Sequence, residues 1–275
     1  MKLKRELRGR ALPFIGMLDQ DMRTYYDRGG ERTRLNGSLE LLRTKVLLER
    51  LLPAPPVRVL DVGGAFGVYA GWLAGRGYSV KLVDPVPLHV ESTRDNGIDA
   101  ELGDARALAE ADESWDAVLL FGPLYHLLDR ADRVRAFAEA RRVVRPGGVV
   151  LAATISRWAS MYEVLLNRMD EQPGFVDATR TDLDTGTRTS TLGIADGFTS
   201  VYFHRPDELP AEVADAGLRL DDLYAVEGMA YWVPDLADRL SDPDRAALVL
   251  ELLARTEREP ATIGATPHVL VAAHR

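Results

Sequence analysis

The chain has 275 residues, of which 46% are hydrophobic and 28% charged, as in ordinary globular proteins. Its 34 Lys and Arg residues against 42 Asp and Glu residues give a formal net charge of −8. That acidity disfavours a nucleic-acid partner, because a polyphosphate backbone is bound by clustered basic side chains. There are no cysteines, which excludes disulfides, thiolate metal ligands and thiol nucleophiles.

Residues 1–56 are predicted to form a helical segment that covers the cofactor site of the next domain. No apolar run is long enough to span a membrane, and no cleavage site follows a signal-like stretch, so we expect a cytoplasmic protein with no membrane partner. Residues 19–52 have a helical pattern, in which Ser38 is the expected N-cap and Glu40 lies in the first turn. Prolines within 53–56 end that helix.

Residues 57–156 alternate between short β-branched runs and helical patterns. Because this alternation needs crossover connections, it predicts a parallel sheet with helices on both faces. The expected strands are 57–62, 78–85, 98–102, 115–122 and 149–156.

The pattern changes after Ser156. Residues 157–203 contain one expected helix, near 161–169, and then a polar Thr- and Asp-rich stretch that we interpret as a lid or a mobile loop. Residues 204–275 complete the same α/β domain with two more strands, 218–228 and 268–274. The predicted fold is a three-layer α/β/α sandwich whose seven-stranded sheet is mostly parallel, with the last strand antiparallel.

A glycine-rich turn, VLDVGGAFG at 59–67, follows the first strand. Glycines let a ligand approach the backbone, and the next helix offers unpaired N–H groups. A dinucleotide fingerprint would need glycine at position 65 and glycine or alanine at position 68, where the chain has Ala65 and Val68.

The same turn resembles motif I of the class I, Rossmann-like S-adenosyl-L-methionine-dependent methyltransferases, D/E-x-G-x-G-x-G. It matches at Asp61, Gly63 and Gly67, with Ala65 in place of the middle glycine. Further matches lie in register over 57–156. They are Asp84 after the second strand, Asp104 after the third, Phe121-Gly122-Pro123 after the fourth, and Arg145-Pro146-Gly147-Gly148 before the fifth.

The resemblance implies S-adenosyl-L-methionine as cofactor, leaving as S-adenosyl-L-homocysteine. Asp84 would hold the ribose hydroxyls and Asp104 the adenine amino group. Alternatively, Asp61 only caps the glycine turn, and Asp84 is an ordinary acid at the end of a strand. The implied cofactor residues are Asp61, Gly63, Gly64, Ala65, Gly67, Asp84, Pro85, Asp104, Ala105, Phe121, Gly122 and Tyr25.

Candidate catalytic residues are His126 and Tyr125, which follow the fourth strand, and His204, which follows the lid. A histidine here could act as a general base, or it could pack against the sheet or anchor the loop. Glu227 is a weaker candidate, and His89 is interpreted as a surface helix residue. No metal site is predicted, because the histidines show no i, i+4 pair.

We therefore expect in-line methyl transfer to an oxygen, nitrogen or carbon of a small molecule, with possible help from His126 as a general base. A peptide is a second acceptor class. The alternatives are an NAD-dependent oxidoreductase on the same sheet and a non-catalytic cofactor-binding protein. Phe121-Gly122-Pro123-Leu124 lacks the D/N/S-P-P-Y/F pattern of base amino-methyltransferases, which again disfavours nucleic acid. The oligomeric state stays open.

Overall fold

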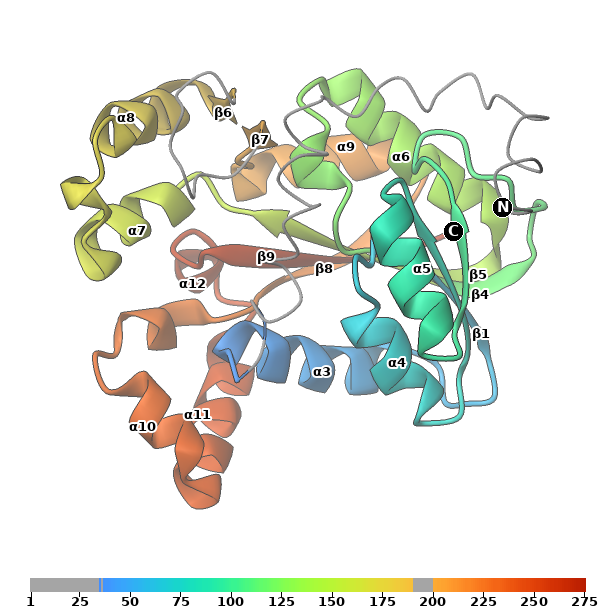
Figure 1. The fold of residues 1–275 in the computed structure, drawn as a ribbon, viewed down its shortest axis with the longest axis horizontal. Helices are drawn as coiled ribbons and strands as arrows, with labels where there is room; N and C mark the ends of the chain where they lie inside the picture. Colours follow the sequence, from blue (N-terminus) through green and yellow to red (C-terminus); the bar gives the residue numbers. More distant parts are fainter. Residues whose placement is uncertain (1–34, 36, 190–199) are drawn as a thin grey trace, which may run out of the picture.

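The structure is a computed structural model, and it describes residues 35, 37–189 and 200–275 (Figure 1). These residues contain a seven-stranded sheet in the order β3-β2-β1-β4-β5-β9-β8. The strands are β1 (Arg58–Val62), β2 (Ser79–Asp84), β3 (Asp99–Leu102), β4 (Trp115–Leu120), β5 (Val144–Ile155), β8 (Arg219–Ala225) and β9 (His268–His274). Strand β9 runs antiparallel to the other six strands of this sheet. The predicted seven-stranded sheet with an antiparallel last strand is confirmed.

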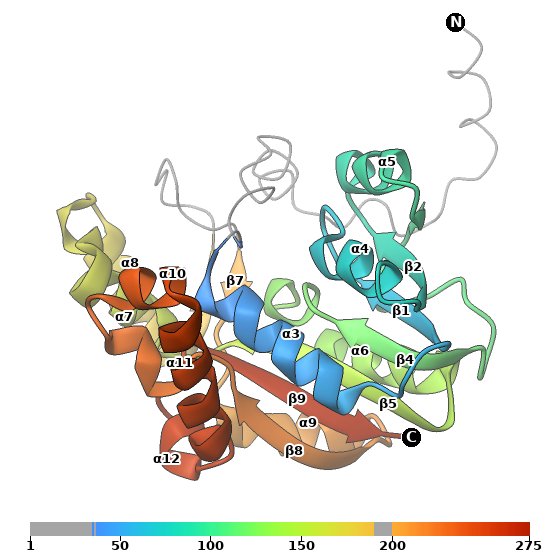
Figure 2. The same cartoon turned by 90° about the horizontal axis from the view of Figure 1, so that it is seen from below.

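Helices cover both faces of the sheet (Figures 1 and 2). Alternate residues of β1 show why: Val59 packs with Leu48 and Leu73 on one face, and Leu60 packs with Phe137 on the other. Strand residues that are apolar on both faces are typical of a doubly covered parallel sheet. The first face carries α3 (Leu39–Leu51), α4 (Val68–Ala74) and α5 (Pro87–Asp95), and the second carries α6 (Arg130–Val143) and α9 (Leu209–Asp215).

Helix α3 begins where the sequence predicted. The Ser38 hydroxyl accepts a hydrogen bond from the Leu41 N–H at 3.1 Å, so one of the unpaired donors of the first turn is satisfied. Glu40 lies in that first turn. Residues 1–34 and 36, which make up most of the predicted N-terminal helical segment, lie outside the described residues.

The segment after β5 contains more regular structure than its polar sequence indicated. It forms α7 (Ala159–Asn167), η4 (Met169–Glu171) and α8 (Phe175–Thr185), followed by the short strands β6 (Thr187–Arg188) and β7 (Val201–Tyr202). The reading of the Thr- and Asp-rich stretch as a loop is wrong for α8. That helix buries Phe175, Ala178, Thr179 and Asp182 at i, i+3, i+4 and i+7, and Asp182 pairs with Arg188.

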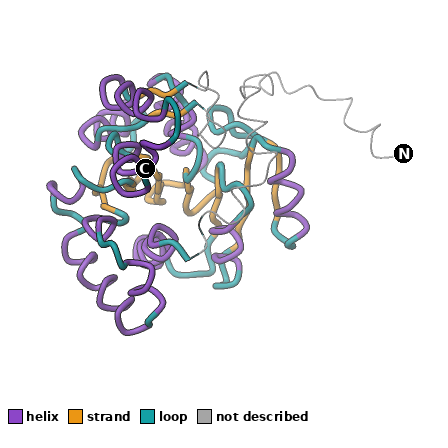
Figure 3. The backbone as a smooth tube through the Cα atoms, turned by 60° about the vertical axis from the view of Figure 1, so that its left-hand side comes forward, coloured by secondary structure: helices purple, strands orange, loops and turns teal. Residues whose placement is uncertain are grey.

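The C-terminal part packs against the sheet and α3 (Figure 2). Figure 3 shows the helices, in purple, around the strands, in orange. It consists of η5 (Pro206–Glu208), α9, β8, η6 (Gly228–Trp232), α10 (Leu236–Ser241), α11 (Pro243–Thr256), α12 (Pro260–Ile263) and β9. Arg43 of α3 bonds the Val226 carbonyl through Nε at 3.1 Å and the Glu257 carboxylate through Nη2 at 2.6 Å. Helix α3 is thereby fastened to the chain that follows β8. The predicted division of the chain into residues 1–56, 57–156, 157–203 and 204–275 stays a prediction.

Candidate functional site

The loops predicted to bind the cofactor meet at one edge of the sheet. Strands β1 to β4 are parallel, so their carboxyl ends lie side by side. The Gly63 N–H donates to the Val83 carbonyl at 2.7 Å, and the Gly103 N–H donates to the Asp84 carbonyl at 3.2 Å. These bonds tie together the loops that follow the first three strands of the chain.

The glycine turn is packed closely against the loop after β4. Gly63 has a φ of +74°, and a Cβ at this position would lie 2.8 Å from Pro123 Cδ. A Cβ on Gly122 would overlap the Gly63 carbonyl. Ala65 also occupies the left-handed region, at φ 49°, where the family pattern has glycine. The two loops can approach each other this closely only because Gly63 and Gly122 lack side chains.

Asp61, the acid of motif I, is fully buried beneath the turn. Neither of its oxygens has a well-formed hydrogen bond among the described residues. Burial raises the pKa of Asp61 to about 7; the Asp84 carboxylate adds to this, and the nearby Ala70 N–H acts against it. A Cβ on Gly64 would overlap this carboxylate, so the backbone of the turn lies directly over it. A buried carboxylate without partners is costly, and a ligand that donates hydrogen bonds or carries positive charge would offset that cost.

Asp84 organises the site through three hydrogen bonds. Its Oδ2 accepts from the Ala65 N–H at 3.0 Å, and its Oδ1 accepts from the Val86 N–H at 2.9 Å and lies 2.9 Å from His89 Nδ1. The interpretation of His89 as a surface residue is wrong, because its side chain is buried. Its position on α5 turns it inward, where the buried Asp84 needs a partner.

Asp104 is held by Arg106. Its Oδ2 accepts from Arg106 Nη2 at 2.6 Å, and its Oδ1 accepts from the Arg106 backbone N–H at 2.8 Å. Burial acts to raise the pKa of Asp104, but the hydrogen bonds and charge of Arg106 outweigh it and lower the pKa. The carboxylate is therefore ionised and fixed in orientation, as an acceptor of hydrogen bonds has to be.

The remaining predicted cofactor residues occupy the same edge. Ala105 and Phe121 are buried, and the Phe121 ring stacks edge-on against Tyr69 at 5.3 Å between ring centroids. Pro85 is exposed directly after Asp84. Tyr25 lies outside the described residues.

Two of the predicted catalytic residues, Tyr125 and His126, form the short helix η3 (Leu124–His126) after β4. The Tyr125 hydroxyl donates to the Phe121 carbonyl at 3.3 Å, and its ring contacts that of His126. Both residues thus lie beside the loop that contacts Gly63. Their catalytic role stays a prediction.

His204 lies in a buried network next to the end of β5. Its backbone N–H donates to the Ile155 carbonyl at 2.8 Å, and its Nε2 is 3.5 Å from Oε2 of Glu212, which also binds Arg133. Burial lowers the pKa of His204, and Glu212 partly opposes this. These contacts favour the loop-anchoring alternative, and the catalytic role of His204 stays a prediction.

Comparison with known proteins decides what kind of domain this is. Residues 59–148 match the family described as "Methyltransferase domain". This segment contains the glycine turn, Asp84, Asp104 and the loop after β4. The core of the chain is a class I methyltransferase domain. Its class depends on S-adenosyl-L-methionine as cofactor.

Individual relatives agree with this assignment over part of their length. The chain is 36% identical over 117 residues to a ubiquinone biosynthesis O-methyltransferase of Methylocella silvestris, covering 40% of this chain and 44% of that protein. The chain therefore spans less than half the length of this curated relative.

Solved structures show that the methyltransferase fold extends beyond the matched segment. An S-adenosylmethionine-dependent methyltransferase of Methanosarcina mazei superposes with a TM-score of 0.57 at 15% identity, covering 83% of this chain and 96% of that one. The geranyl diphosphate C-methyltransferase of Streptomyces coelicolor, solved with Mg²⁺, geranyl diphosphate and S-adenosyl-L-homocysteine, gives a TM-score of 0.52 at 14% identity, covering 86% of this chain and 79% of that one.

The carboxyl edge of the seven-stranded sheet also has a second polar group, which the sequence did not reveal as a unit. Glu40, Glu227 and His268 lie together beyond the end of β5. One signal could have found it: in a sheet whose last strand is antiparallel, the first residue of that strand, His268, lies at the edge where the other strands end.

Across the described residues, no helix has the length and apolar character needed to cross a membrane.

Proposed function

We propose that this chain transfers a methyl group from S-adenosyl-L-methionine to a small-molecule acceptor. The observation that carries the proposal is the buried Asp61 carboxylate, which lies without a well-formed hydrogen bond beneath the glycine turn of a methyltransferase domain. The pKa of Asp61 is about 7, so little free energy is needed to ionise it when a positive ligand binds.

The residues of the site fit this cofactor. S-adenosyl-L-methionine carries an ammonium group and a positive sulfonium, and it supplies an electrophilic methyl group when bound. The turn from Gly63 to Gly67 contains three glycines, and its backbone lies above the Asp61 carboxyl group. Asp84 and Asp104 supply further acceptors at the ends of β2 and β3, next to Pro85 and Ala105.

The protein's own contribution is to orient the acceptor and exclude water. Orientation alone can supply about 7 to 11 kcal/mol in favourable cases. Phe121 and Gly122 would close the site on the side of β4. Tyr125, whose hydroxyl donates to the Phe121 carbonyl, and His126 would contact the acceptor from the same loop. Residues 157–203 are proposed to cover it, through α7 and α8 in their described part.

A small molecule is the acceptor class that the chain supports best. Its net charge of −8 disfavours nucleic acid. The relatives named above methylate oxygen in one case and carbon in the other, by their names, so they leave the methylated atom open. A peptide is the second candidate acceptor.

Calorimetric titration with S-adenosyl-L-homocysteine, with NAD as a parallel titrant, tests the proposal. We expect one-to-one binding of the first at micromolar affinity and none of the second. Asp84→Ala should weaken that binding, because it releases the Ala65 N–H from its acceptor. Binding of NAD alone would instead favour the oxidoreductase alternative. Binding of S-adenosyl-L-homocysteine without turnover on any small molecule or peptide would favour a non-catalytic protein.

A further inference from the structure

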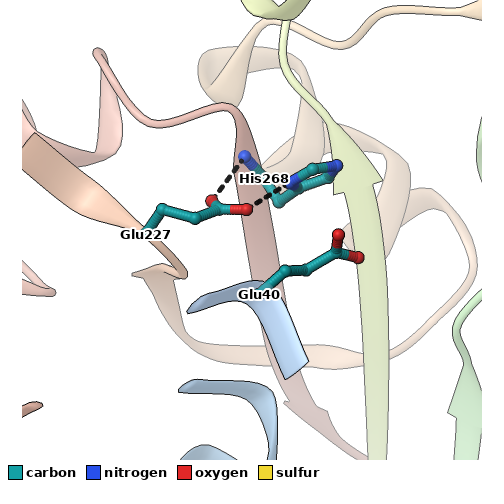
Figure 4. Close-up of side chains that lie close together, drawn as sticks. All are labelled: Glu40, Glu227 and His268. Atoms are coloured by element: carbon teal, nitrogen blue, oxygen red, sulfur yellow. Dashed lines mark hydrogen bonds and ion pairs between the residues drawn. The ribbon is translucent and has the colours of Figure 1, made fainter. Parts of the chain in front are cut away.

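The group formed by Glu40, Glu227 and His268 joins three distant segments at the carboxyl edge of the sheet (Figure 4). Glu40 lies in the first turn of α3, Glu227 follows β8, and His268 opens β9 opposite Ile155 of β5. One oxygen or nitrogen atom from each side chain lies within 4.8 Å of the others. Strand β9 is two strands from β4, about 10 Å at the usual strand spacing, so the group lies beside the cofactor loops but apart from them.

Glu227 fixes the imidazole of His268. Its Oε1 lies 2.5 Å from His268 Nδ1, and its Oε2 accepts from the His268 backbone N–H and the Thr266 hydroxyl, each at 3.2 Å. The Glu227 side chain is 3% exposed, whereas that of His268 is 22% exposed. A carboxylate bound to Nδ1 selects the tautomer with its proton on that nitrogen, which leaves Nε2 as the basic atom.

The backbone around Glu227 is held by a second set of contacts. Arg43 binds the Val226 carbonyl, and the Thr266 hydroxyl accepts from the Gly228 N–H at 3.0 Å. The carboxylate is therefore fixed from both sides. A side chain held by packing and hydrogen bonds is what a catalytic group requires.

Position distinguishes this pair from a merely structural one. His274, at the other end of β9, also pairs with a carboxylate, that of Asp221. That pair lies at the opposite edge of the sheet from the cofactor loops, paired with Val149 of β5. The chain thus provides a matched control on the same strand.

Aromatic side chains flank the group. Tyr162 of α7 contacts the rings of Tyr231 and Trp232 of η6, each at 5.7 Å between centroids, and its hydroxyl donates to the Ala265 carbonyl. Trp232 is 45% exposed. Tyr231 and Trp232 belong to η6, which directly follows Glu227, and the Tyr231 hydroxyl donates to the Glu163 carboxylate at 2.9 Å. Aromatic side chains next to a few fixed polar groups are typical of sites for small aromatic ligands.

We propose that His268, held by Glu227, accepts the proton of a phenolic hydroxyl acceptor that is neutral or cationic, and that Glu40 stabilises the resulting imidazolium. This inference rests on the proposed methyl transfer. The phenolic oxygen forms its bond to the methyl carbon as the carbon–sulfur bond breaks and its electron pair stays on sulfur; the phenolic proton goes to Nε2. Two neighbouring carboxylates disfavour an acceptor that carries its own negative charge.

Histidine-selective ¹⁵N labelling of the full chain, saturated with S-adenosyl-L-homocysteine, tests this without a known acceptor. The probes are tyramine and its anionic counterpart, 3-(4-hydroxyphenyl)propionate. We expect the His268 ring to be protonated on Nδ1 when neutral. Tyramine should shift its Nε2 resonance, the propionate should not do so at equal concentration, and His274 should stay unmoved. Glu227→Gln should change the tautomer of His268, whereas Asp221→Asn should not.

Transfer to tyramine gives the kinetic readout. His268→Gln should lower kcat by about 10² to 10⁴-fold, the usual contribution of a general base, with KM within threefold. Should this variant fail to fold, the spectra of the unaltered chain and of Glu227→Gln still decide whether His268 is the base.

Unmoved His268 resonances in a protein that binds S-adenosyl-L-homocysteine would overturn the base assignment and leave the methyltransferase proposal intact. Selective broadening of those resonances by one equivalent of Mn²⁺ would also overturn it, in favour of a metal site. Loss of S-adenosyl-L-homocysteine binding itself would instead count against the proposed function.

Discussion

The carboxyl edge of the sheet has two halves that are built differently. The cofactor half consists of the loops after β1, β2, β3 and β4, and its contacts join residues that lie close to strand ends within one continuous segment. The second half, which we call the acceptor half after its proposed role, consists of Glu40, Glu227 and His268, which come from the start of α3, the residues after β8 and the start of β9. The first half can be recognised as a sequence motif, whereas the second exists only after the chain has folded.

The largest effect should come from the contact that fastens the acceptor half. Arg43 is buried against Glu257 and the Val226 carbonyl. Arg43→Ala leaves Glu257 without one of its two arginine partners and should lower the free energy of unfolding by about 3 to 5 kcal/mol. Urea denaturation measures this. Arg76→Ala, which breaks an exposed pair with Glu49, is the control and should change little. A loss below about 1 kcal/mol for Arg43→Ala would contradict the fastening role.

The cofactor half should show the opposite behaviour at Asp61, where removing a charge stabilises the protein. Its pKa rises from 3.8 in the unfolded chain to about 7 in the fold, so the folded state binds the proton more tightly. The stability that this proton provides is complete below pH 4 and is lost as the pH rises to 7.

Asp61→Asn should therefore raise the free energy of unfolding at pH 8, by at most about 4 kcal/mol for three pKa units, and change it little at pH 4. Thermal melts at the two pH values, without cofactor, measure this. Equal changes at both pH values would show that Asp61 is not the titrating group.

Packing between the two cofactor loops gives the next effect. Gly122→Ala would place a Cβ against the Gly63 carbonyl and should cost about 1 to 3 kcal/mol of stability. Affinity for S-adenosyl-L-homocysteine should fall with it, since the turn is displaced. The control is Gly71→Ala within α4, where a Cβ would meet only Ile98 at 3.5 Å. Normal affinity in Gly122→Ala would mean that the close approach of the loops does not shape the site.

The smallest effect concerns the departure from the family motif. Ala65 adopts a left-handed conformation that glycine adopts without strain. Ala65→Gly should raise the free energy of unfolding by about 1 kcal/mol. Ala74→Gly, at the end of α4, should lower it by about 0.5 to 1 kcal/mol. Chemical denaturation of both variants checks the signs, and destabilisation by Ala65→Gly would contradict the strain.

Much of the fold could be predicted because its signals are local. The strand–helix alternation, the Ser38 cap and the glycine turn each depend on residues close together in the chain. Helix α8 was missed because two of its four buried residues, Thr179 and Asp182, are polar, and Asp182 is compatible with burial only through Arg188, six residues later. His89 was missed because a polar residue on a helix is normally exposed, and its partner Asp84 lies on a different element.

The acceptor half could not be predicted as a unit because its contacts are long-range. His268 and Glu227 are 41 residues apart, and Arg43 and Glu257, which hold the surrounding backbone, are 214 apart. Each residue alone is an ordinary charged or polar residue. Only the sheet order, with β9 between β5 and β8, brings them to the edge where the cofactor loops lie.

Proton exchange on cofactor binding tests the central claim most directly. If a positive ligand offsets the buried Asp61 carboxylate, binding should drive it to ionise, and its pKa of about 7 means that roughly half a proton is released at pH 7. Calorimetry of S-adenosyl-L-methionine binding in buffers of different ionisation enthalpy measures this number, because the homocysteine product lacks the positive sulfonium. The account predicts that release in the unaltered chain and its loss in Asp61→Asn. Binding without proton release, or release that persists in Asp61→Asn, would contradict it.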